Sequence, residues 1–79
     1  LAIDLYPAQP FAYLSRGKTL QLQKKHQQAI DVLEIGIDFV IENSLLESQF
    51  YTTLVKAYTS INNPKKVLEY KIKLKNHKI

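Results

Sequence analysis

Cysteine is absent from the 79-residue chain, which excludes a disulfide framework and a zinc site built from thiolates. Glycine occurs only twice, and the sequence contains neither a glycine-rich phosphate loop nor an HExxH or GxSxG motif. No apolar run approaches the roughly 20 residues that a membrane-spanning helix needs. These absences remove several large classes of enzyme, and the lack of cysteine leaves the redox compartment open.

The charge of the chain is small in total but unevenly distributed. The net charge is +4. Residues 1–64 hold five basic and six acidic side chains, whereas residues 65–79 hold six lysines and one acidic residue, Glu69. A chain of this length forms one domain at most and buries about 60% of the surface that it exposes when unfolded. We therefore expect one small domain, without a large enclosed pocket or a small-molecule substrate.

Apolar residues at helical spacing lie on both sides of a polar break at 23–25. This pattern predicts two helices that form a hairpin between Phe11 and Ile37. Glycine in the interior of a helix costs roughly 1 kcal/mol against alanine, so Gly17 indicates two backbones that cross closely. The expected buried stripes consist of Phe11, Tyr13, Leu14, Gly17, Leu20 and Leu22 in the first arm and of Ala29, Ile30, Val32, Leu33, Gly36 and Ile37 in the second.

A second pair of helices is expected after the first. The second helix of the first pair should run from about His26 through Ile41 and end near 42–43. Ser44 and Glu47 form a capping-box pattern, which predicts that a third helix begins with Ser44 as its cap and continues to about Ile61. The Asn-Asn-Pro sequence at 62–64 ends that helix and opens a fourth, which covers about 64–76.

The two hairpins correspond to each other at a constant spacing along the chain. This spacing, which we name the repeat offset, relates Tyr13 to Tyr51 and Lys18 to Lys56. The same spacing also aligns the second helix of the first hairpin with the second helix of the second hairpin. In the last helix, Lys71 replaces Leu33 at the matching position. We expect the helices around 39–46 to be lengthened by about one turn, which returns side chains to nearly the same face.

One family has this arrangement of small and large residues. The spacing resembles the tetratricopeptide repeat, a helix-turn-helix unit of about 34 residues, although Arg16 and His26 stand where the family usually has leucine and tyrosine. The positions that carry the resemblance are Tyr13, Gly17, Leu20, Ala29, Leu33 and Gly36.

The resemblance implies an all-α fold in which antiparallel helix-turn-helix repeats stack as a fragment of a right-handed α-solenoid. It implies about four full helices and a residual helical turn at 1–6, which together form the C-terminal part of a longer array. Residues 1–9 would end a preceding repeat, residues 10–43 would form one repeat, and residues 44–79 would form a second, diverged repeat with a capping helix.

In tetratricopeptide arrays the first helices of successive repeats line a concave groove that holds a peptide or a helix of a partner protein. The resemblance therefore implies a protein–protein interaction module, without a cofactor. Lys18 and Lys56 are the only charged residues carried over to the groove, and we expect them to bind acidic groups of a partner, unless they are merely solvated. Leu14 and Thr52 precede these lysines by one turn, so the family's clamp for a C-terminal carboxylate, which pairs lysine with asparagine, is incomplete. The groove residues implied are Phe11, Leu14, Ser15, Lys18, Gln21, Leu22, Gln49, Thr52, Thr53, Lys56, Thr59 and Ser60.

The sequence offers no convincing catalytic or metal site, so we do not expect an enzyme. His26 lies at a hairpin turn and His77 in the tail, and nothing in the sequence brings them together. Four carboxylates recur at spacings of three and four residues on the second helix, which is more typical of a solvated face than of a metal site. They are Asp31, Glu34, Asp38 and Glu42.

Two other functions stay open. The lysine-rich last helix offers cations that nucleic acid or an anionic membrane surface would attract, although such lysines also keep a terminal helix soluble and suit the helix dipole. Alternatively, the fragment self-associates as a homodimer through an apolar face that a neighbouring repeat would otherwise cover. The lysines concerned are Lys65, Lys66, Lys71, Lys73, Lys75 and Lys78.

Overall fold

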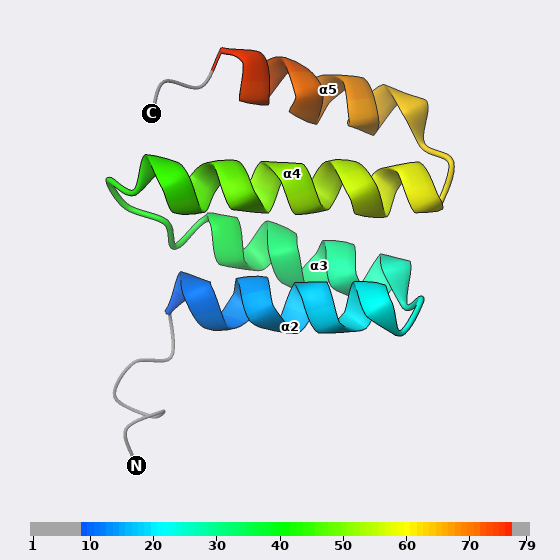
Figure 1. The fold of residues 1–79 in the computed structure, drawn as a ribbon, viewed down its shortest axis with the longest axis horizontal. Coiled ribbons are helices and arrows are strands. Elements are labelled where there is room, and N and C mark those ends of the chain that lie inside the picture. Colours follow the sequence, from blue (N-terminus) through cyan, green and yellow to red (C-terminus); the bar gives the residue numbers. More distant parts are fainter. Residues whose placement is uncertain (1–8, 77–79) are drawn as a thin grey trace.

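The computed structural model describes residues 9–76, which form four α-helices in antiparallel succession (Figure 1). Within this range there is no β-strand, so the expected all-α class with adjacent antiparallel pairs is confirmed. The residual turn expected at 1–6 lies outside the described residues. The helices are α2 (Pro10–Leu22), α3 (His26–Ile37), α4 (Ser44–Ser60) and α5 (Pro64–Lys75).

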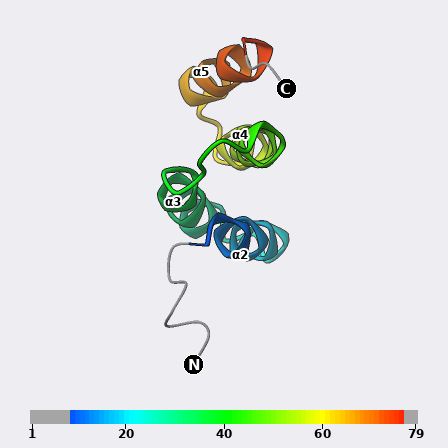
Figure 2. The ribbon, with the colours of Figure 1, turned by 90° about the vertical axis from the view of Figure 1, so that its left-hand side faces the viewer.

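The helices lie side by side in one thin, staggered layer. The principal-axis extents are 40 × 31 × 14 Å. Each helix packs on its neighbour along the chain, and α2 also contacts α4 because α3 is displaced to one side of both (Figure 2). Consequently α2 and α4 share one face of the layer.

The helix starts follow from proline and asparagine. Pro10 and Pro64 occupy the first turns of α2 and α5, where the missing N–H has no partner to lose. The side chain of Asn63 accepts a hydrogen bond from the Lys66 amide at 3.2 Å. The expected serine cap of α4 is wrong by one residue, because Asn43 caps this helix by accepting from the Leu46 amide at 3.0 Å.

The end of α3 also differs from the prediction. The helix ends at Ile37, four residues before Ile41. The amides of residues 38–40 bond to carbonyls three residues back instead of four, which tightens the last turn, and Glu42 then takes a left-handed conformation with φ of 49°. Residues 38–43 therefore form a connecting loop, and the predicted lengthening of this helix is wrong.

The two hairpin turns have the same hydrogen bonds at the repeat offset. Lys24 and Asn62 both adopt positive φ, at 62° and 58°. The Lys24 amide bonds to the Gln21 carbonyl at 3.0 Å, and the Asn62 amide bonds to the Thr59 carbonyl at the same distance. The correspondence between the hairpins thus extends to backbone geometry.

The core lies along α3 and α4. The stripe of α2 is narrower than predicted, because Phe11 and Leu22 are 65% and 85% exposed. Gly17 is on the side of α2 that packs against Leu33 of α3. Phe11 and Leu22 lie beyond Leu14, away from that contact. The buried apolar residues are Leu14, Ala29, Ile30, Leu33, Phe50, Leu54, Ala57, Tyr58 and Tyr70.

Both glycines lie where helices approach each other closely. A Cβ on Gly17 would overlap the side chain of Leu33, whose Cγ would be 2.5 Å away. A Cβ on Gly36 would overlap Cβ of Tyr13 and would lie 2.9 Å from Cε1 of Phe50. The close crossing predicted from Gly17 is therefore present, and Gly36 allows a second one.

Replacing either glycine with alanine is expected to destabilise the fold, although alanine favours an isolated helix. We expect Gly17→Ala to lower the free energy of unfolding by about 1–3 kcal/mol, because Leu33 must leave its rotamer. Gly36→Ala should cost more, because Cβ of Tyr13 is fixed to its backbone and cannot rotate away. Urea unfolding followed by circular dichroism measures both effects. Combining Gly17→Ala with Leu33→Ala should remove the overlap, and a stabilising Gly17→Ala would contradict the close packing.

Candidate functional site

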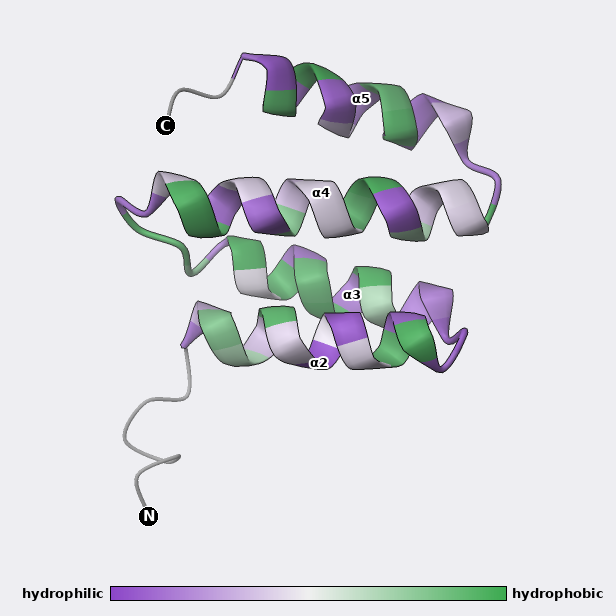
Figure 3. Ribbon diagram, viewed as in Figure 1, coloured by the Kyte–Doolittle hydropathy of each residue, from purple (hydrophilic) through white to green (hydrophobic). Residues whose placement is uncertain are grey.

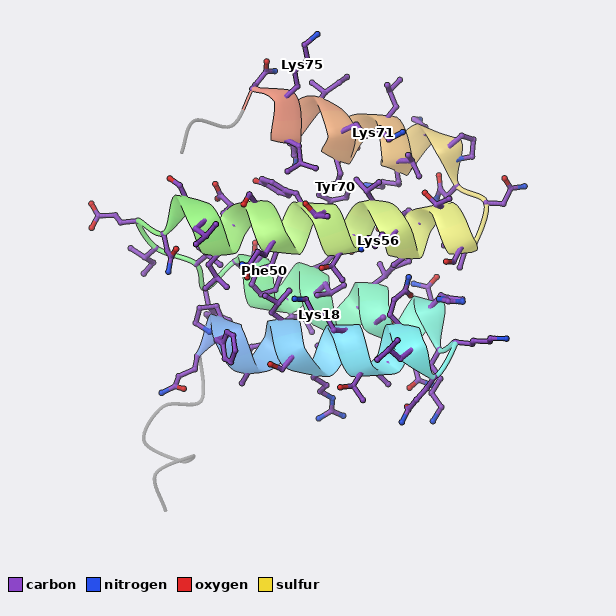
Figure 4. All side chains as sticks on the ribbon, in the orientation of Figure 1. Lys18, Phe50, Lys56, Tyr70, Lys71 and Lys75 are labelled. Atoms are coloured by element: carbon purple, nitrogen blue, oxygen red, sulfur yellow. The ribbon has the colours of Figure 1, made fainter. Side chains whose placement is uncertain are left out.

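An open depression lies between α2 and α4 and has a volume of about 380 Å³. Its lining on α2 consists of Lys18, Gln21 and Leu22, and its lining on α4 consists of Thr53 and Lys56. All five residues belong to the groove set inferred from the sequence. Figure 4 shows the labelled Lys18 and Lys56 on these two helices.

Helical spacing explains why these residues meet. On α2 the lining residues are three and four positions apart, and on α4 they are three apart, so each set shares one side of its helix. Within residues 9–76, no carboxylate forms an ion pair with Lys18 or Lys56. Both ammonium groups are therefore available to anionic groups of a partner.

Hydroxyl groups extend the polar surface along α4. The hydroxyls of Thr52, Thr53, Thr59 and Ser60 all donate to carbonyls four residues earlier in the same helix. Their oxygens remain able to accept hydrogen bonds, so the lysines supply the charged donors of this face.

The remaining predicted groove residues do not all belong there. Leu14 is 1% exposed and lies in the core, so its inclusion in the groove is wrong. Phe11 is exposed near the start of α2, outside the depression. The others, Ser15, Gln49, Thr52, Thr59 and Ser60, are exposed on α2 and α4 without lining this depression.

A second polar cluster connects α3, α4 and α5. The hydroxyl of Tyr58 donates to the Glu34 carboxylate, and the hydroxyl of Tyr70 donates to the same oxygen at 3.2 Å. Glu34 is half-buried, so its assignment to a solvated carboxylate face is wrong, whereas Asp31, Asp38 and Glu42 are exposed. Sequence reasoning missed this cluster. The available signal was two tyrosines at buried positions, whose hydroxyl groups need hydrogen-bond partners.

Aromatic stacking and one lysine complete this cluster. The rings of Tyr58 and Tyr70 stack at 5.8 Å and 17°. The Lys73 ammonium lies 5.0 Å from the Tyr70 ring centroid and 5.9 Å from that of Tyr51. The same ammonium lies 3.9 Å from a Glu69 oxygen, and Lys66 lies 3.6 Å from the other. Two of the lysines in α5 are therefore engaged within the chain.

The tyrosines titrate above their ordinary range. Burial raises the pKa of Tyr58 and of Tyr70 above 10.0, and the negative charge of Glu34 and the hydrogen bonds to it raise both further. Burial also raises the pKa of Tyr51, with a smaller contribution from Glu47. All three phenols are therefore protonated at neutral pH, as donation to a carboxylate requires.

One of the two histidines lies in the described part of the chain, at the turn between α2 and α3. Nδ1 of His26 is 2.6 Å from Oε1 of Gln21, so this histidine is satisfied by a hydrogen bond at the hairpin turn. Among residues 9–76, no three acidic or histidine side chains converge as a metal site. No helix in this range has the length and apolar character required to span a bilayer. His77 and Lys78 lie outside the described residues.

Comparison with known proteins adds no relative. No protein-family model, curated protein sequence or solved structure matches the chain.

The tyrosine cluster predicts a loss of stability in alkali. Below pH 10.0 the phenols are protonated in the folded and in the unfolded chain, so their contribution to stability is fully present. Above this pH the unfolded chain releases their protons first, so the free energy of unfolding falls as the pH rises toward the folded-state pKa values. Thermal melts at about pH 9 and about pH 11 should show a clear drop in Tm.

A double variant, Tyr58→Phe with Tyr70→Phe, serves as the control for this drop. Its Tm should be lower at about pH 9, because Glu34 loses both donors, but its further decrease at about pH 11 should be smaller. An equal decrease in the wild type and in the variant would contradict the assignment.

Proposed function

We propose that the chain is a protein–protein interaction module of the tetratricopeptide type that binds an acidic segment of a partner in the depression between α2 and α4. The main supporting observation is that Lys18 and Lys56, which are related by the repeat offset, line one depression from separate helices. The equivalent turns at the same offset also favour a repeat.

The chemistry of the depression favours an elongated partner with carboxylates. It is open, so it suits a peptide or helix lying across α2 and α4 better than an enclosed small molecule. The exposed Leu22 provides an apolar contact beside the two ammonium groups. Gln21 adds an amide to the depression, and the exposed hydroxyls of Thr52, Thr59 and Ser60 add acceptors along α4 for a partner long enough to reach beyond it.

The alternative of nucleic-acid binding through α5 has weaker support. Lys66 and Lys73 already pair with Glu69, and Lys73 also contacts two tyrosine rings. The lysines of α5 are spread around the helix and do not form a single basic stripe. Figure 3 shows hydrophilic and hydrophobic segments alternating along α5. Non-specific binding to phosphates would depend on such a stripe.

Selection from a random peptide display library would test the proposal directly. We expect the wild-type chain to enrich acidic peptides, and we expect Lys18→Glu with Lys56→Glu to weaken their binding by about tenfold or more. The matched control is Lys24→Glu with Lys25→Glu, which makes the same change in net charge at the hairpin turn. Fluorescence anisotropy with one enriched peptide measures all three dissociation constants.

Two results would refute the groove as the binding site. Equal losses in both double variants would show that only the net charge matters. Unchanged binding in the groove variant would place the partner elsewhere. Circular dichroism of each variant verifies that the exposed substitutions leave the fold intact.

A further inference from the structure

Helix α5 has a neighbour on only one side. Among the described helices, α3 is flanked by α2 and α4, whereas α5 packs on α4 alone. As a result Leu68 and Ile72 are 60% and 49% exposed, although they lie four residues apart on one side of the helix. Tyr70 points the other way, toward α4 and the core (Figure 4).

The repeat offset shows what this exposed side corresponds to. We define the open face of α5 as Leu68, Lys71, Ile72 and Lys75, all of which are exposed. Leu68 and Lys71 correspond to Ile30 and Leu33 of α3, which are 1% and 0% exposed and which α2 and α4 enclose. The open face thus matches the side of α3 on which a helix is packed.

A depression of about 370 Å³ adjoins the open face, between the end of α4 and the start of α5. Val67, Leu68 and Lys71 line one wall, and Thr59 lines the other. The hollow and the exposed apolar residues lie on the side of α5 where a further helix would pack as α4 packs beside α3.

The charge of the open face restricts what can cover it. Lys71 occupies the position of Leu33, and Lys75 follows one turn later at the position of Ile37. The nearest acidic residue in the sequence, Glu69, pairs with lysines on the other side of α5. A helix that buries Leu68 and Ile72 must therefore bring carboxylates to Lys71 and Lys75.

A second copy of this chain does not meet that requirement. For copies to stack head to tail, α2 of one would have to cover α5 of the other as α4 covers α3. The buried residues Phe50, Leu54 and Ala57 of α4 correspond to Ala12, Arg16 and Thr19 of α2, which are exposed. This side of α2 is small, polar and basic, so it offers neither apolar area nor carboxylates.

We propose that the open face of α5 docks an acidic amphipathic helix of another protein, with apolar residues on Leu68 and Ile72 and carboxylates at Lys71 and Lys75. This site is separate from the depression between α2 and α4, and it does not depend on the function proposed for that groove. The helix would occupy the place beside α5 that α4 occupies beside α3.

The test uses two peptides of 17 residues that keep the apolar residues of α4. In the first peptide, glutamate occupies all of the remaining positions. In the second peptide, lysine occupies the same positions. We expect the full chain to bind the acidic peptide, with a dissociation constant below about 1 mM, and to bind the basic peptide at least about tenfold more weakly. Fluorescence anisotropy gives the affinities, and amide chemical shifts should change along 67–75.

Variants identify the face that is used. Leu68→Ser with Ile72→Ser, and separately Lys71→Glu with Lys75→Glu, should each weaken the acidic peptide by at least about tenfold. Amide shift changes along 67–75 that Leu68→Ser with Ile72→Ser abolishes separate this site from the groove. The charge-matched control is Lys24→Glu with Lys25→Glu.

Several outcomes would overturn the proposal. These are absence of acidic-peptide binding, equal binding of both peptides, or indifference to Leu68→Ser with Ile72→Ser. Binding to anionic phosphatidylserine vesicles is measured in parallel. Vesicle binding that depends on the same residues, without peptide binding, would assign the face to a lipid surface. Concentration-dependent sedimentation abolished by Leu68→Ser with Ile72→Ser would assign it to a second copy.

Discussion

The close contact at Gly36 of α3 determines how α2, α3 and α4 are placed. The missing Cβ at this position leaves room for Cβ of Tyr13 on α2 and for the Phe50 ring on α4. Phe50 is fully buried, so the contact lies inside the core. Because α3 meets both helices here, α2 and α4 are set at a distance that allows them to touch. The depression that holds Lys18 and Lys56 therefore depends on a small residue in a helix that contributes nothing to its lining.

Part of this arrangement follows from the sequence and part does not. Three of the four helices begin and end within about one residue of the sequence-based expectation, because Pro10, Pro64 and the polar turns are local signals that need no tertiary context. The predicted end of α3 was wrong because Phe39 and Ile41 continue the apolar pattern into the loop. Periodicity records which residues are apolar and does not record where the backbone stops being helical.

The candidate site shows the same division. Five of the residues that the repeat offset assigned to the groove, Lys18, Gln21, Leu22, Thr53 and Lys56, line one depression. It also included Leu14, because helical spacing alone does not separate the edge of a buried stripe from its centre. Glu34 was misassigned for another reason. Its partners are 24 and 36 residues away, and only the packing of three helices reveals them.

The hydrogen bonds of Glu34 also link the open face of α5 to the stability of the fold. Glu34 accepts hydrogen bonds from Tyr58 on α4 and from Tyr70 on α5. It therefore connects α3 to α5, although these two helices do not otherwise pack against each other. Helix α5 has one neighbour and only one buried residue, which makes it the element most exposed to local opening. Opening of α5 would remove Tyr70 from Glu34 and uncover the Tyr58 ring. A ligand that binds only the closed arrangement of α5 stabilises the folded chain by mass action. Binding of a helix to the open face would therefore stabilise the hydrogen bonds of Glu34, even though the open face and Tyr70 lie on different sides of α5.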